Sequence, residues 1–350
     1  MTTYASRESV VKATLRGILE TVPGLRLTSW ERGGGGGASS GLAAKVQSGG
    51  QKWRLVVEVK GSGEPRLVRS AVQWLTSTIA GRSNAYGIVA APYISRDSGG
   101  ICREAGVGYL DLAGNCRLAF GQVFIERQGA APMASDRRAL RDVFAARSSR
   151  VLRVLFEEPK KTWQVQELAQ RAKVSLGLAF KVKQRLLDME YATLEGRAVR
   201  LARAEDLLRV WAGKYDYRKN RTLDCYGSGE PPELERTLAA YCARERIPYA
   251  LASFSGAARV VPFTRYSRSF ALVSGDLEEL ARDLDWKPVP SGANFTLLAP
   301  FDEGVLYGAR NIDGELVASD VQLFLDLSST KGRGEEAAQL LLEQRLRSSW

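Results

Sequence analysis

Histidine is absent from this 350-residue sequence, and cysteine occurs only four times. Without an imidazole side chain, the protein cannot use a Ser-His-Asp triad, a Cys-His pair or an HExxH zinc motif. The cysteines are scattered and form no CxxC pair: Cys102, Cys116, Cys225 and Cys242. Their spacing argues against a disulfide framework and against a zinc site, and it predicts four small buried side chains.

The sequence also lacks long apolar runs, and its N-terminus lacks the basic and then apolar segments of a secretion signal. We therefore expect no membrane span and no membrane partner, and we predict a cytoplasmic protein. With 45% hydrophobic and 25% charged residues, the composition is globular, and the length suggests two or three domains.

Positive charge is concentrated in the middle of the chain. Residues 137–221 hold 21 basic and 10 acidic residues, a net charge of +11. Residues 1–136 (16 basic, 10 acidic) net +6, and residues 222–350 (13 basic, 19 acidic) net −6. Runs rich in small residues, glycine and proline lie near both boundaries, at Gly129–Ser135 and Gly227–Pro232. These breaks predict three domains, and the concentrated charge is typical of a module that binds double-stranded DNA.

The first part of the chain alternates helical and strand-like segments. Helices are predicted over residues 6–21 and 65–80, and the predicted strands are 25–30, 42–46, 53–59 and 85–91. This alternation indicates an α/β sandwich. The glycine run Gly33–Gly37 is not followed by the GK[ST] and helix of a phosphate-binding loop, so we interpret it as a flexible loop.

Glu58 and Lys60 lie two residues apart on one predicted strand, so their side chains point to the same face of the sheet. The pattern resembles the ExK half-motif of the restriction-endonuclease-like, PD-(D/E)XK, superfamily, and Gln73 on the following helix also fits that fold. The resemblance implies a nuclease in which two acids hold a divalent metal and the lysine orients or activates water.

The first acid of that motif is missing, because the strand at residues 42–46 carries no carboxylate. One carboxylate is a poor magnesium site, and Glu8 or Glu20 could complete it only if the fold brought one of them close. Three interpretations stay open: an active metal site, an endonuclease-like scaffold that has lost its site, and a simple ion pair between Glu58 and Lys60. We favour the two inactive interpretations, which need no metal or other cofactor; only a nuclease would need magnesium.

The middle part has the pattern of a winged helix-turn-helix. Helices are predicted over residues 148–156, 165–172 and 175–189, followed by a hairpin of strands 191–194 and 198–201. The third helix has apolar residues on one side and cations, an amide and a glycine on the other, as a helix in a DNA major groove has. The candidate DNA-contacting residues are Thr162, Ser175, Gly177, Phe180, Lys181, Lys183, Gln184, Arg197 and Arg200. The alternative is a helical domain with a solvated basic face.

The last part mixes helices, predicted over 232–246 and 276–284, with strands at 268–273, 294–298 and 305–310. This pattern predicts a second α/β domain. The domain contains no paired acids in the arrangement of a nucleotidyl-transfer site. Its acidic excess therefore favours contact with a protein partner or with a second copy of the chain.

Four runs carry a family resemblance: Gly106–Asn115 (GVGYLDLAGN), Phe301–Gly308 (FDEGVLYG), Val321–Leu327 (VQLFLDL) and Gly332–Ala338 (GRGEEAA). They resemble the AbiEi-type antitoxin and transcriptional-regulator family of type IV toxin–antitoxin systems. The resemblance implies a winged-helix repressor that binds its own promoter and is paired with a nucleotidyltransferase-like toxin.

The chain departs from the short form of that family by its endonuclease-like first domain. Two function classes therefore stay open. One is a DNA-binding regulator of the antitoxin type, and the other is a metal-dependent DNA nuclease targeted by the winged helix. A second metal-binding acid beside Glu58 would favour the nuclease, and its absence would favour the regulator.

Overall fold

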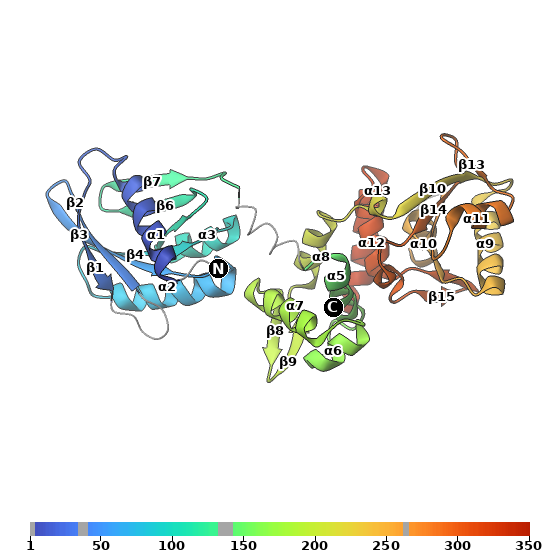
Figure 1. The fold of residues 1–350 in the computed structure, drawn as a ribbon, viewed down its shortest axis with the longest axis horizontal. Helices are drawn as coiled ribbons and strands as arrows, with labels where there is room; N and C mark the ends of the chain where they lie inside the picture. The colour runs from blue at the N-terminus through green and yellow to red at the C-terminus, as the bar shows by residue number, and fades with distance from the viewer. Residues whose placement is uncertain (1–3, 34–40, 132–142, 262–265) are drawn as a thin grey trace. The chain divides into compact units, whose positions relative to one another are not determined.

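The computed structural model describes residues 4–33, 41–131, 143–261 and 266–350 (Figure 1). The chain divides into two compact units. They are Met1–Arg141 with Asp188–Glu190, and Asp142–Leu187 with Tyr191–Trp350. Each unit contains a seven-stranded mixed sheet and several helices. The predicted α/β multidomain class is therefore confirmed.

The first unit is a sheet covered by helices on both faces. Its strands lie side by side in the sheet in the same order as in the chain. They are β1 (Arg26–Gly33), β2 (Gly41–Ser48), β3 (Gln51–Val59), β4 (Ala85–Ala91), β5 (Gly108–Asp111), β6 (Cys116–Phe120) and β7 (Val123–Arg127). Its helices are α1 (Tyr4–Leu19), α2 (Pro65–Ile79) and α3 (Arg96–Glu104). Strands β3, β4 and β5 run parallel, and the crossovers between them contain α2 and α3.

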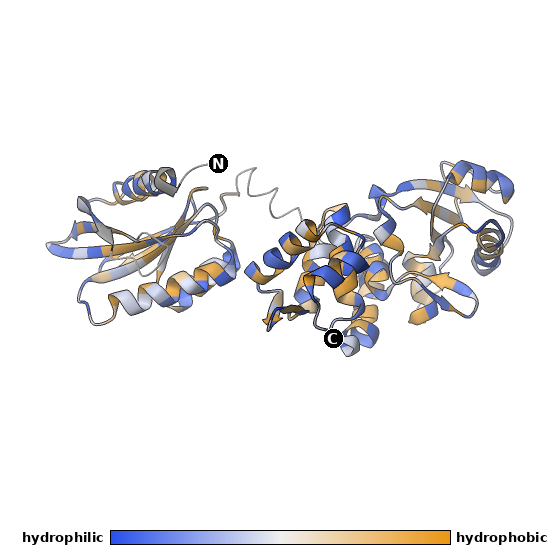
Figure 2. Cartoon of the chain, turned by 60° about the horizontal axis from the view of Figure 1, so that its bottom comes forward, coloured by the Kyte–Doolittle hydropathy of each residue, from blue (hydrophilic) through white to orange (hydrophobic). Residues whose placement is uncertain are grey.

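Different helices cover the two faces of this sheet, as the alternation of side chains along β3 requires. Leu55, Val57 and Val59 pack in one core with the fully buried Leu15 of α1. Val56 packs on the opposite face with α2 and α3. Glu58, two residues further along, shares the face of Val56. Figure 2 shows hydrophobic residues along the strands of this sheet.

The predicted helices and strands of residues 6–91 are present, with shifted ends. The sequence pattern did not predict α3 or β5–β7. Strand β5 lies within the run Gly106–Asn115. Asp111 in this run is fully buried and accepts the backbone N–H groups of Ile94 and Asn115 at 3.0 and 2.9 Å. The run therefore stabilises the turn between β5 and β6. Residues 34–37 of the glycine run lie outside the described residues.

In the second unit, residues 146–201 form three helices and a hairpin, which we call the hairpin module. Its elements are α5 (Ala146–Glu157), α6 (Val165–Arg171), α7 (Leu176–Asp188), β8 (Ala192–Glu195) and β9 (Ala198–Leu201), and α8 (Ala204–Ala212) follows. All five elements predicted for the middle part are present, with ends within two residues of the predicted ones. Trp163, just before α6, exchanges two backbone hydrogen bonds with Val199 of β9 at 2.8 and 2.9 Å. The start of α6 is thereby tied to the hairpin.

The rest of the second unit is another sheet with helices on both faces. In spatial order its strands are β13 (Lys287–Pro288), β10 (Arg221–Tyr226), β14 (Phe295–Ala299), β12 (Ser269–Val273), β11 (Tyr249–Leu251), β16 (Glu315–Val317) and β15 (Arg310–Ile312). Its helices are α9 (Pro231–Glu245), α10 (Ser253–Val260), α11 (Leu277–Asp283), α12 (Asp320–Ser328), α13 (Arg333–Leu341) and α14 (Arg347–Ser349), with helical turns η1 (Tyr217–Lys219), η2 (Glu303–Leu306) and η3 (Leu342–Leu346). Helices α9 and α11 pack on one face, and α10, α12 and α13 pack on the other. The predicted second α/β arrangement is present.

The strand predicted over residues 305–310 is wrong. The chain forms the helical turn η2 and then begins β15 at Arg310. Asp302 starts the turn, because its Oδ1 accepts the N–H of Gly304 at 2.8 Å. Gly308, at φ +76°, then redirects the chain. The apolar residues of this segment therefore belong to a packed turn.

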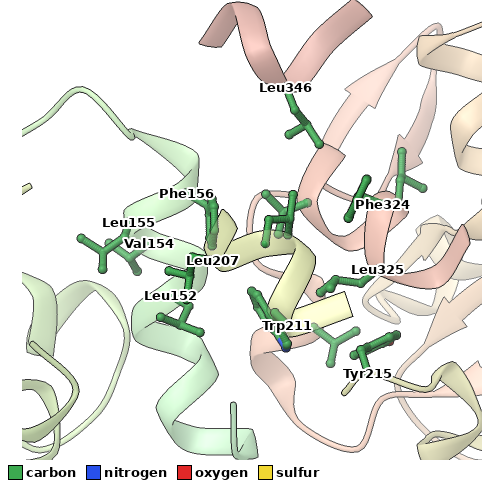
Figure 3. Close-up of a cluster of buried hydrophobic side chains, with 14 of the residues drawn as sticks. Leu152, Val154, Leu155, Phe156, Leu207, Trp211, Tyr215, Phe324, Leu325 and Leu346 are labelled. Carbon is green, nitrogen blue, oxygen red and sulfur yellow. The ribbon is translucent and has the colours of Figure 1, made fainter. Parts of the chain in front are cut away.

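The hairpin module and the second sheet share one hydrophobic core. Trp211 of α8 is 2% exposed and belongs to the same buried cluster as Leu152 and Phe156 of α5 and Leu325 of α12 (Figure 3). The rings of Trp211 and Phe156 stack with their centroids 6.2 Å apart. This core crosses the domain boundary predicted between residues 221 and 222. Division of the chain into three domains stays a prediction from charge and composition.

The four cysteines are buried and unpaired, as predicted. Burial raises the pKa of Cys102 and of Cys242 to about 12, so these thiols stay protonated at neutral pH. Within the described ranges, each helix is too short or too polar to cross a bilayer.

Candidate nucleic-acid interface

Helix α7 is the central element of the candidate interface. Ser175 precedes it and caps it, because the Ser175 Oγ accepts the N–H of Leu178 at 3.2 Å. Ala179, Val182 and Leu186 are buried in the shared core. Their spacing of three and four residues forms one apolar face, which fixes the rotation of the helix and leaves the opposite face in solvent.

The solvent face of α7 carries five of the predicted DNA-contacting residues. Gly177, Phe180 and Lys181 are exposed, and Lys183 and Gln184 are half-buried. The Nζ of Lys183 lies 5.1 Å from the centroid of the Phe180 ring, a cation–π contact that helps to orient both side chains. The helix thus presents cations that can pair with phosphates next to groups that can contact base edges.

Leu176, which was not among the predicted site residues, lies one turn before Phe180. Its side chain is 50% exposed, and that of Phe180 is 52% exposed. Residues four apart on a helix are neighbours, so two large apolar side chains lie next to each other on a polar face. The signal in the sequence is this apolar pair, which is out of phase with the buried Ala179 and Val182.

The hairpin turns at Gly196 and Arg197. Gly196 has φ +62°, as the first central residue of a type II′ turn has. Arg197 is exposed at the tip of the hairpin. Arg200 forms an ion pair with Glu195 across the hairpin. Because this carboxylate already partly neutralises Arg200, we expect Arg197 to contribute more to phosphate contact.

Thr162 and Ser175 lie before the first turns of α6 and α7. Thr162 is half-buried beside Trp163, whose bridge to Val199 holds this segment against the hairpin. Ser175 is exposed even though its hydroxyl caps α7. Ser175 is suited to phosphate contact, because backbone N–H groups at helix N-termini attract anions, whereas Thr162 lies two residues before Gln164, the N-cap of α6.

Glu58 and Lys60 lie at the carboxyl end of β3 in the first unit. Glu58 is 1% exposed, and its Oε1 lies 2.9 Å from the Nζ of Lys60. The pair is close enough for ionic attraction but does not have hydrogen-bond geometry, and neither Glu58 oxygen has a hydrogen-bond partner among the described residues. This arrangement supports the ion-pair interpretation.

The residues around Glu58 do not fit a two-acid magnesium site. Helix α1, which carries Glu8 and ends one residue before Glu20, packs on the opposite face of the sheet. Gln73 is exposed on α2, on the side away from the buried Val72 and Leu75. Across the described ranges, no three Asp, Glu, Cys or His residues are grouped as metal ligands would be. A single carboxylate next to an ammonium group supplies too few ligands.

The run Val321–Leu327 contributes two polar residues to the interior of the second unit. Asp326 is buried on α12, and its Oδ1 accepts hydrogen bonds from the hydroxyl of Tyr215 at 3.0 Å and from Nε2 of Gln322 at 2.6 Å. Burial raises the pKa of Asp326 to about 7, although these hydrogen bonds favour its ionised form.

Arg153 of α5 is buried near the same cluster. Its guanidinium has no hydrogen-bond partner in the described part of the chain and lies 5.2 Å from the ring centroid of Trp211. Burial lowers the pKa of Arg153, and the charge of Asp326 acts in the opposite direction. The cluster therefore couples a buried cation of the hairpin module to a titrating acid of α12.

Residues 200–347 match the family model described as "Transcriptional regulator, AbiEi antitoxin, Type IV TA system". This part of the chain, which is less than half of its length, is similar to the AbiEi family. Within this AbiEi region lie the runs Phe301–Gly308, Val321–Leu327 and Gly332–Ala338. The run Gly106–Asn115 and nearly all of the hairpin module lie before it.

No curated protein matches the chain. One solved structure, described as the structure of EndoMS in apo form, aligns at 18% identity with a TM-score of 0.22. The alignment covers 29% of this chain and 45% of that chain, which is less than half of its length. A TM-score this low does not establish a common fold.

Proposed function

We propose that this protein is a transcriptional regulator of the type IV antitoxin kind, which reads duplex DNA with the hairpin module as a winged helix-turn-helix. The observation that carries the proposal is the solvent face of α7, where Lys181 and Lys183 lie beside groups suited to base contact. The family of the AbiEi region supports the regulatory role. A cytoplasmic location is part of the proposal.

Each part of the module has a distinct role in this proposal. Lys181, Lys183 and Arg197 neutralise phosphates, and Gln184 contacts base edges in the major groove. Arg197 reaches the backbone or minor groove from the tip of the wing. The net charge of +11 over residues 137–221 favours DNA of any sequence, so specificity depends on α7.

The first prediction is a strong dependence of duplex affinity on salt. Lys181→Ala and Arg197→Ala are each expected to flatten the slope of log affinity against log salt by about one unit, because each removes one phosphate contact. Fluorescence anisotropy with a labelled duplex at several salt concentrations measures the slope. Lys287→Ala, which removes an exposed lysine from the AbiEi region, is the matched control and is expected to leave the slope unchanged. Undetectable binding at low salt would refute the proposal.

We also propose that the acidic residues 222–350 hold a protein contact. Their net charge of −6 disfavours DNA and leaves this region available to a cognate nucleotidyltransferase-like toxin or to a second copy of the chain. A regulator that binds as a homodimer would read two half-sites with two copies of α7.

A metal-dependent nuclease targeted by the winged helix is the second candidate function. It is favoured by the buried Glu58 next to Lys60 at the end of a central strand. We propose instead that residues 1–136 keep an endonuclease-like sandwich without the activity. The motif needs two carboxylates to hold magnesium, and here Glu58 is the only one and is already paired with Lys60.

The second prediction is therefore little or no cleavage of supercoiled or linear DNA in the presence of magnesium or manganese. The wild-type protein is expected to behave like Glu58→Ala and Lys60→Ala in this assay. Metal-dependent cutting by the wild type that both substitutions abolish would make the nuclease the primary function. Cutting that survives both substitutions would point to a contaminating enzyme.

A further inference from the structure

Large apolar side chains are exposed at seven positions in the described part of the chain, and three of the seven lie in the hairpin module. Leu176 and Phe180 are on α7, and Leu194 is on β8. Single exposed apolar residues are common and need no explanation. Two such residues one turn apart on a cationic helix face indicate that the face is covered by a partner with apolar groups.

The charge around this pair indicates the chemistry of that partner. Leu176, Phe180 and Gln184 follow one another at intervals of four residues, so they form one row along α7. Lys181 and Lys183 flank the row. Cations beside the row favour a polyanion as the binding partner. In the major groove of duplex DNA, the apolar group that a base edge presents is the C5 methyl of thymine.

We propose that Leu176 and Phe180 read thymine methyl groups, and that the preferred duplex carries thymines opposite the first two turns of α7. The inference rests on the proposed DNA-binding function and names its specificity. The contact of Lys183 with the Phe180 ring restricts the ring before DNA arrives, which reduces the entropy lost on binding. Gln184, one turn further along, is suited to the N6 and N7 edge of adenine.

The experiment begins with a duplex that the full-length protein selects from a randomised library. Each thymine is then replaced by deoxyuridine, which removes only the C5 methyl group and keeps the base pair. At each contacted position the wild type is expected to lose about fourfold in affinity, the factor that corresponds to exposing one buried methyl group. Positions outside the footprint of α7 are expected to show no change.

Variants then connect the methyl groups to the side chains. Phe180→Ala and Leu176→Ala are each expected to bind the thymine and deoxyuridine duplexes equally at the position that the side chain contacts. Leu194→Ala removes an exposed apolar side chain of the same module from β8, and as the matched control it is expected to keep the preference for thymine. Circular dichroism shows whether each variant is folded.

The outcomes distinguish this inference from the proposed function. Salt-dependent duplex binding by the wild type with no effect of deoxyuridine overturns the inference and leaves the proposed function in place. Absence of any duplex binding overturns both. If Phe180→Ala instead lowers the sedimentation mass and leaves the thymine preference intact, the pair is an interface between copies of the chain and the inference fails.

Discussion

Replacing Trp211 with alanine is expected to lower the free energy of unfolding of the second unit by about 3–5 kcal/mol, as removal of large buried aromatic side chains does. Trp211 stacks with Phe144 and Phe156, and both pairs of ring centroids are 6.2 Å apart. The substitution removes these contacts and leaves a cavity next to the buried guanidinium of Arg153. The surrounding helices can close this cavity only in part.

Trp211→Ala also tests whether the hairpin module and the AbiEi region are stabilised together. Hydrogen exchange resolved by peptide follows α7 and α12 separately, and both are expected to lose protection by a similar free energy, because both contribute to the core that contains Trp211. Trp211→Phe keeps an aromatic ring at this position and is the matched control, with a smaller expected loss. Reduced protection in α7 alone would contradict the shared core.

The stability of the second unit is expected to decrease as pH rises from about 4 to about 7 because of Asp326. Burial raises the pKa of Asp326 to about 7 in the folded protein, whereas the unfolded chain has the ordinary value near 3.8. The stabilising contribution of the protonated form is fully present below the unfolded pKa and is lost as pH rises through the folded pKa. At 1.36 kcal/mol per pKa unit, the total change is up to about 4 kcal/mol.

Asp326→Asn removes this titration and keeps an oxygen that can accept from Tyr215 and Gln322. Urea unfolding monitored by hydrogen exchange in α12, at several pH values between 4 and 8, is expected to show the asparagine variant gaining stability relative to wild type as pH rises. Asp206→Asn, which removes an exposed carboxylate from α8, is the control for the loss of one negative charge. If the wild type instead becomes more stable than the asparagine variant as pH rises, ionised Asp326 stabilises the buried charge of Arg153.

The hairpin module could be predicted from the sequence because its signals are local. The apolar spacing of Ala179, Val182 and Leu186 defines the buried face of α7, and Ser175 marks its beginning. Gly196 supplies the positive φ that the two-residue turn needs. Each signal lies within one or two turns of the element that it specifies, so no knowledge of distant contacts was required.

The candidate site was only partly predictable, because burial and ionic partners depend on tertiary contacts. The sequence places Glu58 and Lys60 on one face, but it does not show that α1, which carries Glu8 and ends just before Glu20, covers the opposite face. Gln73 fits a pattern in the sequence, whereas the packing of α2 leaves it exposed.

By itself, the sequence therefore determined the helices and strands of residues 6–91 and of the hairpin module, the location of the excess positive charge and the absence of histidine chemistry. Only the tertiary structure decided that the hairpin module and the AbiEi region share a core, and that Arg153 and Asp326 are buried in it. The physical reason is sequence separation. Periodicity and capping act between residues a few positions apart, whereas the core joins residues more than a hundred positions apart, such as Tyr215 and Asp326.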